Sequence, residues 1–171
     1  MSAKVRLPVA ECGGINVAAF MDMLAYAEGT ERYGADDGYN VIVGGSLFHD
    51  YADHPRKRIQ LREDDPCTQR DESLASTAAG RYQFLARTWD DCRKRLGKLL
   101  LPDFSPASQD RACILLLRQC GAHSMLLANR FEDALNCARG LWASLPGAGY
   151  GQREVKADKL REIYIKAGGS V

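Results

Sequence analysis

The amino-acid sequence predicts an α+β fold in which helices dominate and a small antiparallel sheet forms a minor lobe. Apolar residues recur with helical spacing over residues 17–28 and again in most of the chain from Ala79 onward. Between these regions, residues 39–43 form a short β-branched run, and residues 58–61 offer a partner strand. A sheet inserted after the first helix would place a cleft where the two lobes meet.

The length and composition favour one globular domain. The chain has 171 residues, of which 46% are hydrophobic and 26% are charged, and this is enough to bury a core. We therefore expect a single domain over residues 1–171, with residues 1–16 as an irregular N-terminal arm. The 23 basic and 22 acidic residues leave a net charge of +1, so we expect no nucleic-acid partner.

Neither a membrane span nor an export signal is expected near the N-terminus. The longest apolar run there, residues 17–27, contains Asp22 and is too short to cross a bilayer. Residues 1–16 have a mixed character, with Pro8 and Glu11 among them, and lack the pattern of a signal peptide. The sequence thus predicts synthesis in the cytoplasm and no stable membrane insertion.

The first helix ends in a glutamate that has the properties of a general acid. Its apolar face is formed by residues at i, i+3, i+4 and i+7: Phe20, Met23, Leu24 and Ala27. Glu28 continues this face, and Gly29 then supplies a helix end. The negative end of the helix dipole and desolvation would both raise the pKa of this carboxyl group, as a general acid near neutral pH requires. The alternative is a solvated surface glutamate.

Further helices are predicted in the second half of the chain. They cover about residues 79–97, 105–121, 131–145 and 157–167. Ser105 as N-cap and Pro106 at the first helical position mark the start of the second of these. Residues 47–57 and 63–76 are polar and are expected to form loops.

The cysteines and histidines predict no metal site. No C-x-x-C pair is present among the six cysteines, and none of the three histidines flanks a cysteine at zinc spacing. Cys12 and Cys67 lie in loop-like sequence and are the pair that a disulfide would join. The other cysteines are expected to be buried thiols.

Four stretches occur in a fixed order along the chain: AEGT at 27–30, GYNVIVGG at 38–45, STAAGRYQ at 76–83 and WASLPGAGYGQ at 142–152. Residues 50–57 and 103–110 add to this pattern. Together they resemble the lambda-type family of bacteriophage endolysins, and the resemblance runs from about Phe20 to Gly169.

This resemblance implies a lysozyme-like fold and a peptidoglycan lytic transglycosylase. Such an enzyme cleaves the β-1,4 bond between N-acetylmuramic acid and N-acetylglucosamine and leaves 1,6-anhydromuramic acid. Glu28 matches the family's catalytic acid and would act as the single general acid and base. The implied partner is the glycan strand of peptidoglycan, and the family needs neither a metal nor an organic cofactor. The protein would stay in the host cytoplasm before lysis and reach the cell wall in the periplasm through a separate holin. We expect a monomer, because the sequence has no long coiled-coil pattern.

Seven residues in the matched stretches are predicted to bind the glycan: Tyr39, Asn40, Arg81, Tyr82, Gln83, Tyr150 and Gln152. They supply aromatic rings, amides and a guanidinium that suit hydroxyl and acetamido groups. Residues 146–151 and 50–57 would form two lips of the cleft. For Tyr39 and Tyr82 the alternative is packing inside the fold, and for Arg81 it is a surface charge. The lambda-type pattern has an acidic residue where Asn40 stands, so one supporting charge is missing here.

Two other functions stay open. A hydrolysing muramidase would pair Glu28 with a second carboxylate, for which Asp50 and Asp53 are the candidates. A non-catalytic glycan-binding phage protein would keep the fold without the chemistry. Product mass separates a transglycosylase from a muramidase, because its product is one water lighter. Wall binding without a loss of turbidity would indicate the non-catalytic protein.

Overall fold

The computed structural model describes residues 6–33, 36–62, 74–151 and 153–171. Its elements, in chain order, are α1 (Val9–Cys12), α2 (Ile15–Glu28), β1 (Ile59–Arg62), β2 (Leu74–Ser76), α3 (Ala86–Leu100), α4 (Pro106–Gln119), α5 (Ala122–Leu127), α6 (Phe131–Ala138) and α7 (Ala157–Lys166). Helices dominate and the two strands pair antiparallel, so the predicted α+β class is confirmed.

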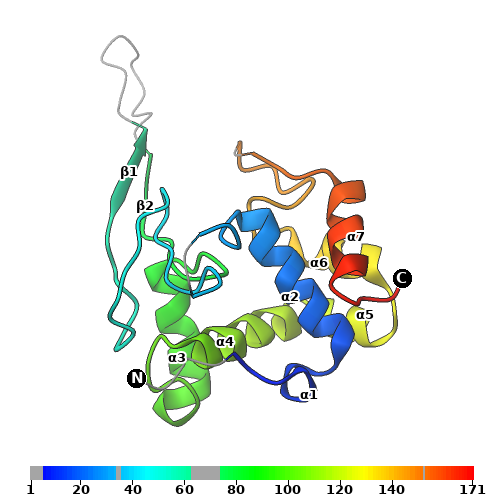
Figure 1. Ribbon diagram of the computed structural model, residues 1–171, viewed down its shortest axis with the longest axis horizontal. Helices are drawn as coiled ribbons and strands as arrows, with labels where there is room; N and C mark the ends of the chain where they lie inside the picture. Colours follow the sequence, from blue (N-terminus) through cyan, green and yellow to red (C-terminus); the bar gives the residue numbers. More distant parts are fainter. Residues whose placement is uncertain (1–5, 34–35, 63–73, 152) are drawn as a thin grey trace.

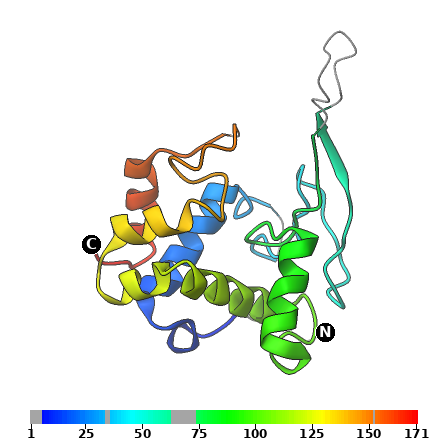
Figure 2. The same ribbon diagram turned by 180° about the vertical axis from the view of Figure 1, so that it is seen from behind.

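The elements separate into two halves on either side of α2 (Figure 1). Helices α5, α6 and α7 lie on one side, whereas α3 and the β1–β2 hairpin lie on the other, and α4 connects the two halves. The view from behind shows the same division, with the hairpin standing away from the helices (Figure 2). Helix α2 packs against α1, α5 and α7. It is therefore the element around which the other helices are arranged.

Two groups of aromatic rings fill the two halves of the core. Beside α2, the rings of Phe20, Phe131 and Tyr164 lie together, with centroids 4.5 Å apart for the last two. On the side of α3, Trp89 packs edge-on against Phe104 with centroids 4.7 Å apart. Edge-to-face contacts of this kind stabilise aromatic clusters beyond the area that they bury.

Helix α2 ends where the sequence predicted and begins two residues earlier than expected, at Ile15. Gly29 adopts a left-handed conformation (φ 68°). Its N–H donates to Tyr26 O, and the N–H of Thr30 donates to Ala25 O. These two hydrogen bonds satisfy carbonyl groups that the end of the helix would otherwise leave unpaired. The predicted end at Glu28 thus follows from a glycine that tolerates positive φ.

The predicted strand over residues 39–43 is wrong, as is its pairing with residues 58–61. Strand β1 pairs instead with β2, with Ile59 opposite Ser76. Gly44 and Gly45 both have positive φ and turn the chain back directly after residue 43. Residues 41–43 therefore form only isolated bridges and hydrogen bonds, to residues 46–47 and to residues 78–80.

Two predicted helix boundaries were also wrong. Helix α3 begins at Ala86 rather than near residue 79, because residues 80–83 form a turn in which Gly80 and Gln83 both have positive φ. Leu85, the residue directly before this helix, is 43% exposed. Helix α6 ends at Ala138, although the predicted helix continued to residue 145.

Other elements differ less from expectation. The predicted start of α4 is confirmed, with Pro106 at its first position, although the side chain of Ser105 makes no capping hydrogen bond. Helix α7 lies within the predicted residues 157–167. Helix α5 and the short α1, which falls inside the expected N-terminal arm, were not predicted.

Within the described residues, every helix is too short or too polar to span a bilayer, and no cluster of three or more potential ligands is placed to hold a metal ion. Cys12 is a buried free thiol, and Cys67, its predicted disulfide partner, lies outside the described residues.

Candidate active site

A pocket of about 420 Å³ lies at the C-terminal end of α2. Its lining residues come from the end of α2 and the segment after it, from residues 41–45, from the turn before α3, and from the segment between α6 and α7. They are Ala27, Glu28, Gly29, Thr30, Arg32, Tyr33, Val41, Ile42, Val43, Gly44, Gly45, Gln83, Ser144 and Arg153. The segment after α6 lies beside the end of α2 in both views (Figures 1 and 2).

Glu28 is the last residue of α2 and its carboxyl group lines this pocket. Ser144 Oγ donates a hydrogen bond of 2.6 Å to Glu28 Oε1. Burial raises the pKa of Glu28 to about 7, and the hydrogen bond from Ser144 lowers it by a smaller amount. Desolvation therefore determines the direction of the pKa shift, because the carboxylate loses more free energy of hydration on burial than one hydrogen bond from a hydroxyl group restores. The carboxyl group is substantially protonated near neutral pH.

Ser144 is held in place from both sides. Its carbonyl accepts a hydrogen bond of 2.8 Å from Val155 N. Two residues earlier, Trp142 Nε1 donates to the carbonyl of Tyr82 across 3.2 Å. These contacts anchor the segment after α6 to the turn before α3. Ser144 belongs to one of the matched sequence stretches, but its role depends on a contact across 116 residues that no local pattern reveals.

Of the predicted glycan-binding residues that the structure describes, Gln83 is the one that lines the pocket with Glu28. It has positive φ (49°), and its Nε2 donates to Gly80 O at 2.9 Å and to Val41 O at 3.3 Å. The amide thus joins the turn before α3 to residues 39–43, which are called the extended segment below. Among the described residues, no donor pairs with its Oε1, which leaves an acceptor for a ligand.

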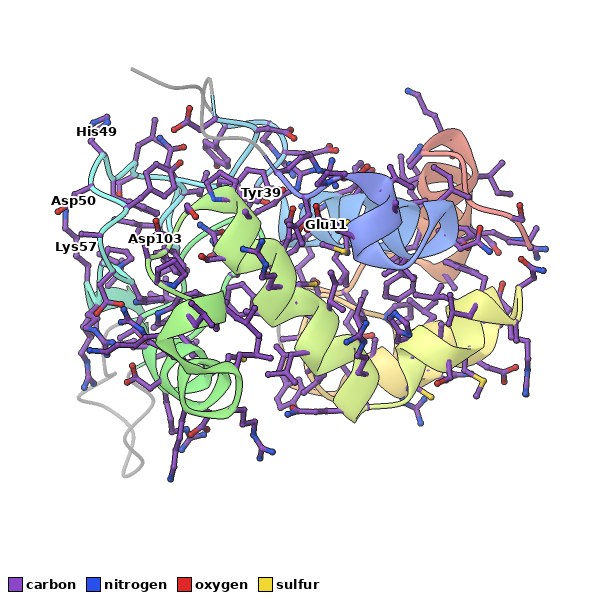
Figure 3. All side chains as sticks on the ribbon, turned by 90° about the horizontal axis from the view of Figure 1, so that it is seen from below. Glu11, Tyr39, His49, Asp50, Lys57 and Asp103 are labelled. Atoms are coloured by element: carbon purple, nitrogen blue, oxygen red, sulfur yellow. The ribbon has the colours of Figure 1, made fainter. Side chains whose placement is uncertain are left out.

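Tyr39 and Tyr82 do not line the pocket. Tyr82 is 1% exposed, and its hydroxyl donates to Asp110 Oδ1 at 2.6 Å. The hydroxyl of Tyr39 donates to the same oxygen at 2.8 Å, and Figure 3 shows Tyr39 beside α4. Both rings therefore pack inside the fold, which was the alternative to glycan binding for these two tyrosines. Sequence reasoning missed Asp110, whose pKa burial raises, because a buried aspartate on a helix resembles a surface one in sequence.

Arg81 and Asn40 also lie away from the pocket lining. Arg81 is 4% exposed, so it is not a surface charge, and its guanidinium pairs with Asp22 at 3.0 Å and with Asp37 at 2.9 Å. It lies 5.3 Å from the centre of the Tyr39 ring, within reach of a cation–π interaction. Asn40 is buried, and its Oδ1 has no hydrogen-bond partner among the described residues.

The remaining predicted contacts are more peripheral. Tyr150 is 58% exposed, and its hydroxyl donates to the carbonyl of Gly140. Gln152 lies outside the described residues. Neither the described part of residues 146–151 nor residues 50–57 contributes to the pocket lining.

The two candidate second carboxylates are not in the pocket. Asp50 is exposed at the outer edge of its loop with His49 and Lys57 (Figure 3). Asp53 pairs with Arg56 and Arg93. Burial alone would raise the pKa of Asp53, but its hydrogen bonds and Arg56 outweigh burial and lower it. Among the described lining residues, Glu28 is the single carboxyl group.

A sequence model described as Endolysin matches residues 18–171, nearly the whole chain. The chain belongs to the endolysin family. This endolysin is 47% identical over 156 residues to the endolysin of Escherichia phage lambda, covering 90% of this chain and 91% of the relative. It is also 47% identical over 161 residues to the endolysin of Escherichia phage P2, covering 90% and 93%.

Solved structures agree with the family. Bacteriophage lambda lysozyme complexed with a chitohexasaccharide matches with a TM-score of 0.81 at 45% identity, covering 98% of this endolysin and 99% of that chain. A second structure, lysozyme from bacteriophage lambda, matches with a TM-score of 0.78 at 45% identity, covering 92% and 97%. The predicted lysozyme-like fold and the resemblance to lambda-type endolysins are both confirmed. As an endolysin, the protein belongs to the enzymes that degrade peptidoglycan.

Proposed function

We propose that this endolysin is a lytic transglycosylase that cleaves the β-1,4 bond between N-acetylmuramic acid and N-acetylglucosamine. One observation carries the proposal: within the described residues, the pocket is lined by one carboxyl group, whose pKa of about 7 suits both donation and acceptance of a proton. A hydrolase of the usual kind needs two carboxyl groups flanking the bond. A transglycosylase needs one, because its nucleophile belongs to the substrate.

The reaction begins with the protonated form of Glu28. The acid donates its proton to the glycosidic oxygen while the bond from that oxygen to C1 of N-acetylmuramic acid breaks, which leaves an oxocarbenium-like centre. The carboxylate then takes the proton from the 6-hydroxyl of the same sugar, and O6 attacks C1 to close a 1,6-anhydro ring. No water is consumed. The tethered hydroxyl has a high effective concentration, so ring closure is favoured over hydrolysis.

Ser144 and the segments around the pocket position this acid. Because the Ser144 hydroxyl donates its hydrogen bond to Glu28 Oε1, the acidic proton of Glu28 is carried on the other carboxyl oxygen. The same hydrogen bond stabilises the carboxylate formed after the first step. Two opposing influences on one group thus keep both of its protonation states accessible during the cycle.

A glycan as occupant of the pocket is supported by the relative that was solved with a chitohexasaccharide. We propose that Gln83 contacts the glycan directly. Tyr39, Arg81 and Tyr82 would act behind it by fixing the turn before α3, and Asn40 by supporting the extended segment. Tyr150 and Gln152 remain predicted contacts from the segment after α6. The same proposal includes a monomer acting as one domain, held in the host cytoplasm until a holin releases it to the wall.

Analysis of the products tests the chemistry. Digested peptidoglycan should release muropeptides that end in 1,6-anhydromuramic acid, each one water lighter than the hydrolysis product and without a reducing end. Glu28→Gln should fold and release none of them. Reducing muropeptides from the wild type would replace the proposal with a hydrolysing muramidase, and wall binding without any release would indicate a non-catalytic protein.

A further inference from the structure

Two arginines in the pocket lining have no partner among the residues that the structure describes. Arg32 lies after α2, and Arg153 lies before α7, and both are exposed. Neither makes a hydrogen bond or an ion pair with any described residue, whereas the buried Arg81, outside the lining, forms ion pairs with Asp22 and Asp37. Because the described lining holds these two arginines and one acid, Glu28, it carries a net positive charge in either protonation state of that acid.

Arg32 places one of these charges beside Gly29, the residue that follows the acid. Its guanidinium folds back over Gly29, the residue after Glu28, so that a Cβ on this glycine would lie 3.0 Å from Nη2. Arg153 lines the same pocket from the segment between α6 and α7, which Val155 anchors to Ser144 by a hydrogen bond of 2.8 Å. The two guanidinium groups thus approach the same pocket from segments far apart in sequence.

The two arginines are not what shifts the pKa of Glu28, because burial and the hydrogen bond from Ser144 determine that shift. A chitooligosaccharide carries no charge for them to bind. Peptidoglycan does, because its muramic acid residues carry a lactyl group and stem peptides that contain carboxylates. A guanidinium is suited to a carboxylate, which it can bind through two parallel hydrogen bonds.

We propose that Arg32 and Arg153 form a carboxylate-binding subsite that selects glycan bearing the acidic groups of muramic acid over neutral glycan. The subsite rests on the proposed function for its substrate class. It adds a specificity-determining pair from segments that flank the catalytic residue. The carboxylate is supplied by the stem peptide or, on strands stripped of peptides, by the free lactyl group.

Binding measurements on uncleaved ligand test the subsite. Glu28→Gln protein, with and without Arg32→Gln and Arg153→Gln, is titrated at low ionic strength with three probes. These are soluble glycan strands with stem peptides, strands freed of peptides by an amidase, and chitohexaose. The double arginine variant should bind peptide-bearing strands about tenfold more weakly, and the difference should shrink in high salt. Chitohexaose should bind both proteins equally.

The two sources of carboxylate give different results. Weakening with peptide-bearing strands alone assigns the subsite to the stem peptide. Weakening with stripped strands alone assigns it to the lactyl group, whose carboxyl group is amide-bonded until the amidase frees it, and weakening with both shows that either carboxylate is bound. In each case, amidation of the carboxylates with carbodiimide and ammonia should abolish the difference between the two proteins.

Arg87→Gln with Arg95→Gln is the matched control, because it removes the same charge from exposed positions on α3 outside the pocket lining. Equal weakening by the control would reduce the effect to general charge attraction and overturn the subsite. Equal loss of chitohexaose binding, or no loss with either acidic strand, would overturn it too. A failure of the proposed function would instead appear as wall cleavage that survives Glu28→Gln, or as reducing products from the wild type.

Discussion

Glu28 carries two opposing influences on one carboxyl group, and each can be removed separately. Burial favours the neutral acid, whereas the hydroxyl of Ser144 favours the carboxylate. A carboxyl group without the first would be ionised at neutral pH and could not donate a proton. Without the second, it would be protonated too strongly to accept the proton back.

Ser144→Ala should shift the pH dependence of lysis. Loss of the hydrogen bond removes a contact that favours the carboxylate, so the pKa of Glu28 should rise above about 7. The alkaline limb of the kcat/KM profile should then move to higher pH, while the maximal rate falls severalfold because the acid is less well positioned. Turbidity assays across pH measure both effects. Ser124→Ala, at an exposed position on α5, should leave the profile unchanged. A limb that moves to lower pH would contradict this view of Ser144.

Glu28→Gln should stabilise the protein in alkali and not in acid. The folded pKa of about 7 lies above the ordinary value of 4.5. The neutral acid therefore makes its full contribution to the free energy of unfolding below pH 4.5, and this contribution is lost as the pH rises through 7. The variant avoids this loss, so it should gain up to about 3 kcal/mol over the wild type at pH 8 and almost nothing at pH 4. Urea unfolding at both pH values measures the difference.

The exposed Glu31→Gln is a suitable comparison, since it makes the same chemical change three residues away. It should change stability little at either pH. If Glu28→Gln shows the same small effect at pH 8, the carboxyl group is already ionised there without cost, and the raised pKa is incorrect.

Among the elements, the turn at residues 80–83 supports the base of the pocket through a buried amide. Gln109 Oε1 accepts a hydrogen bond of 2.9 Å from Arg81 N. Its Nε2 donates to the carbonyls of Tyr39 at 2.9 Å and Phe104 at 2.8 Å. One side chain of α4 therefore fixes the turn, the extended segment and the segment before α4.

Gly80→Ala should disrupt this arrangement. The glycine has φ 80°, and a Cβ there would overlap Gln109 Oε1 and lie 2.8 Å from Gln109 Cδ. Strain and displacement of the amide should together cost about 3 kcal/mol or more. Gly97→Ala has nearly the same φ (77°) with no atom within 4 Å of the added Cβ, so it should cost about 1 kcal/mol. Thermal unfolding of both variants tests the contrast, and similar losses would show that Gln109 yields easily.

Features determined by residues close together in sequence were predictable, whereas features determined by contacts between distant residues were not. Helical periodicity and one glycine were enough to predict the end of α2 and hence the location of Glu28. The conformation of residues 39–43 was not predictable in the same way, because two glycine turns and a hydrogen bond from Gln109 determine the partners of these residues. Tyr82 could not be distinguished from a surface tyrosine, since its burial depends on Asp110 at 28 residues' distance.

The site was predicted only in part for the same reason. Glu28 and Gln83 line the pocket as expected. Ser144, Arg32 and Arg153 reach it from irregular segments, where the direction of a side chain depends on the packing of the whole fold. The matched stretch at residues 142–152 is the sequence signal that contained the first of these.

At the scale of the whole molecule, Asp110 connects parts that are distant in sequence. Its Oδ1 accepts the hydroxyl hydrogens of Tyr39 and Tyr82, and its Oδ2 accepts a hydrogen bond of 2.9 Å from Leu7 N. The N-terminal arm, the extended segment and the turn before α3 thus converge on one carboxylate of α4. A buried acceptor of this kind is costly to lose because it leaves several donors unpaired.

Asp110→Asn should loosen the junction between the two halves. The amide nitrogen would face at least one donor, so the variant should lose about 2–4 kcal/mol of stability and much of its activity. Asp91→Asn, at an exposed position on α3, should lose neither. Denaturant unfolding and turbidity assays give the comparison. A variant that unfolds like the wild type would show that the two tyrosines hold their positions by packing alone.

The enclosure of α2 by other helices separates two tasks that many enzymes combine in one segment. The proposed proton donor is built into a helix that packs against α1, α5 and α7, whereas the walls that would recognise the polymer belong to irregular connections. Those connections can vary in length and charge without disturbing the donor as long as Gly29 and Ser144, which hold it in place, are retained. Exchange of the other residues of 29–45 or 141–155 between homologues should therefore retarget the enzyme to walls of different composition while its bond-breaking step is preserved.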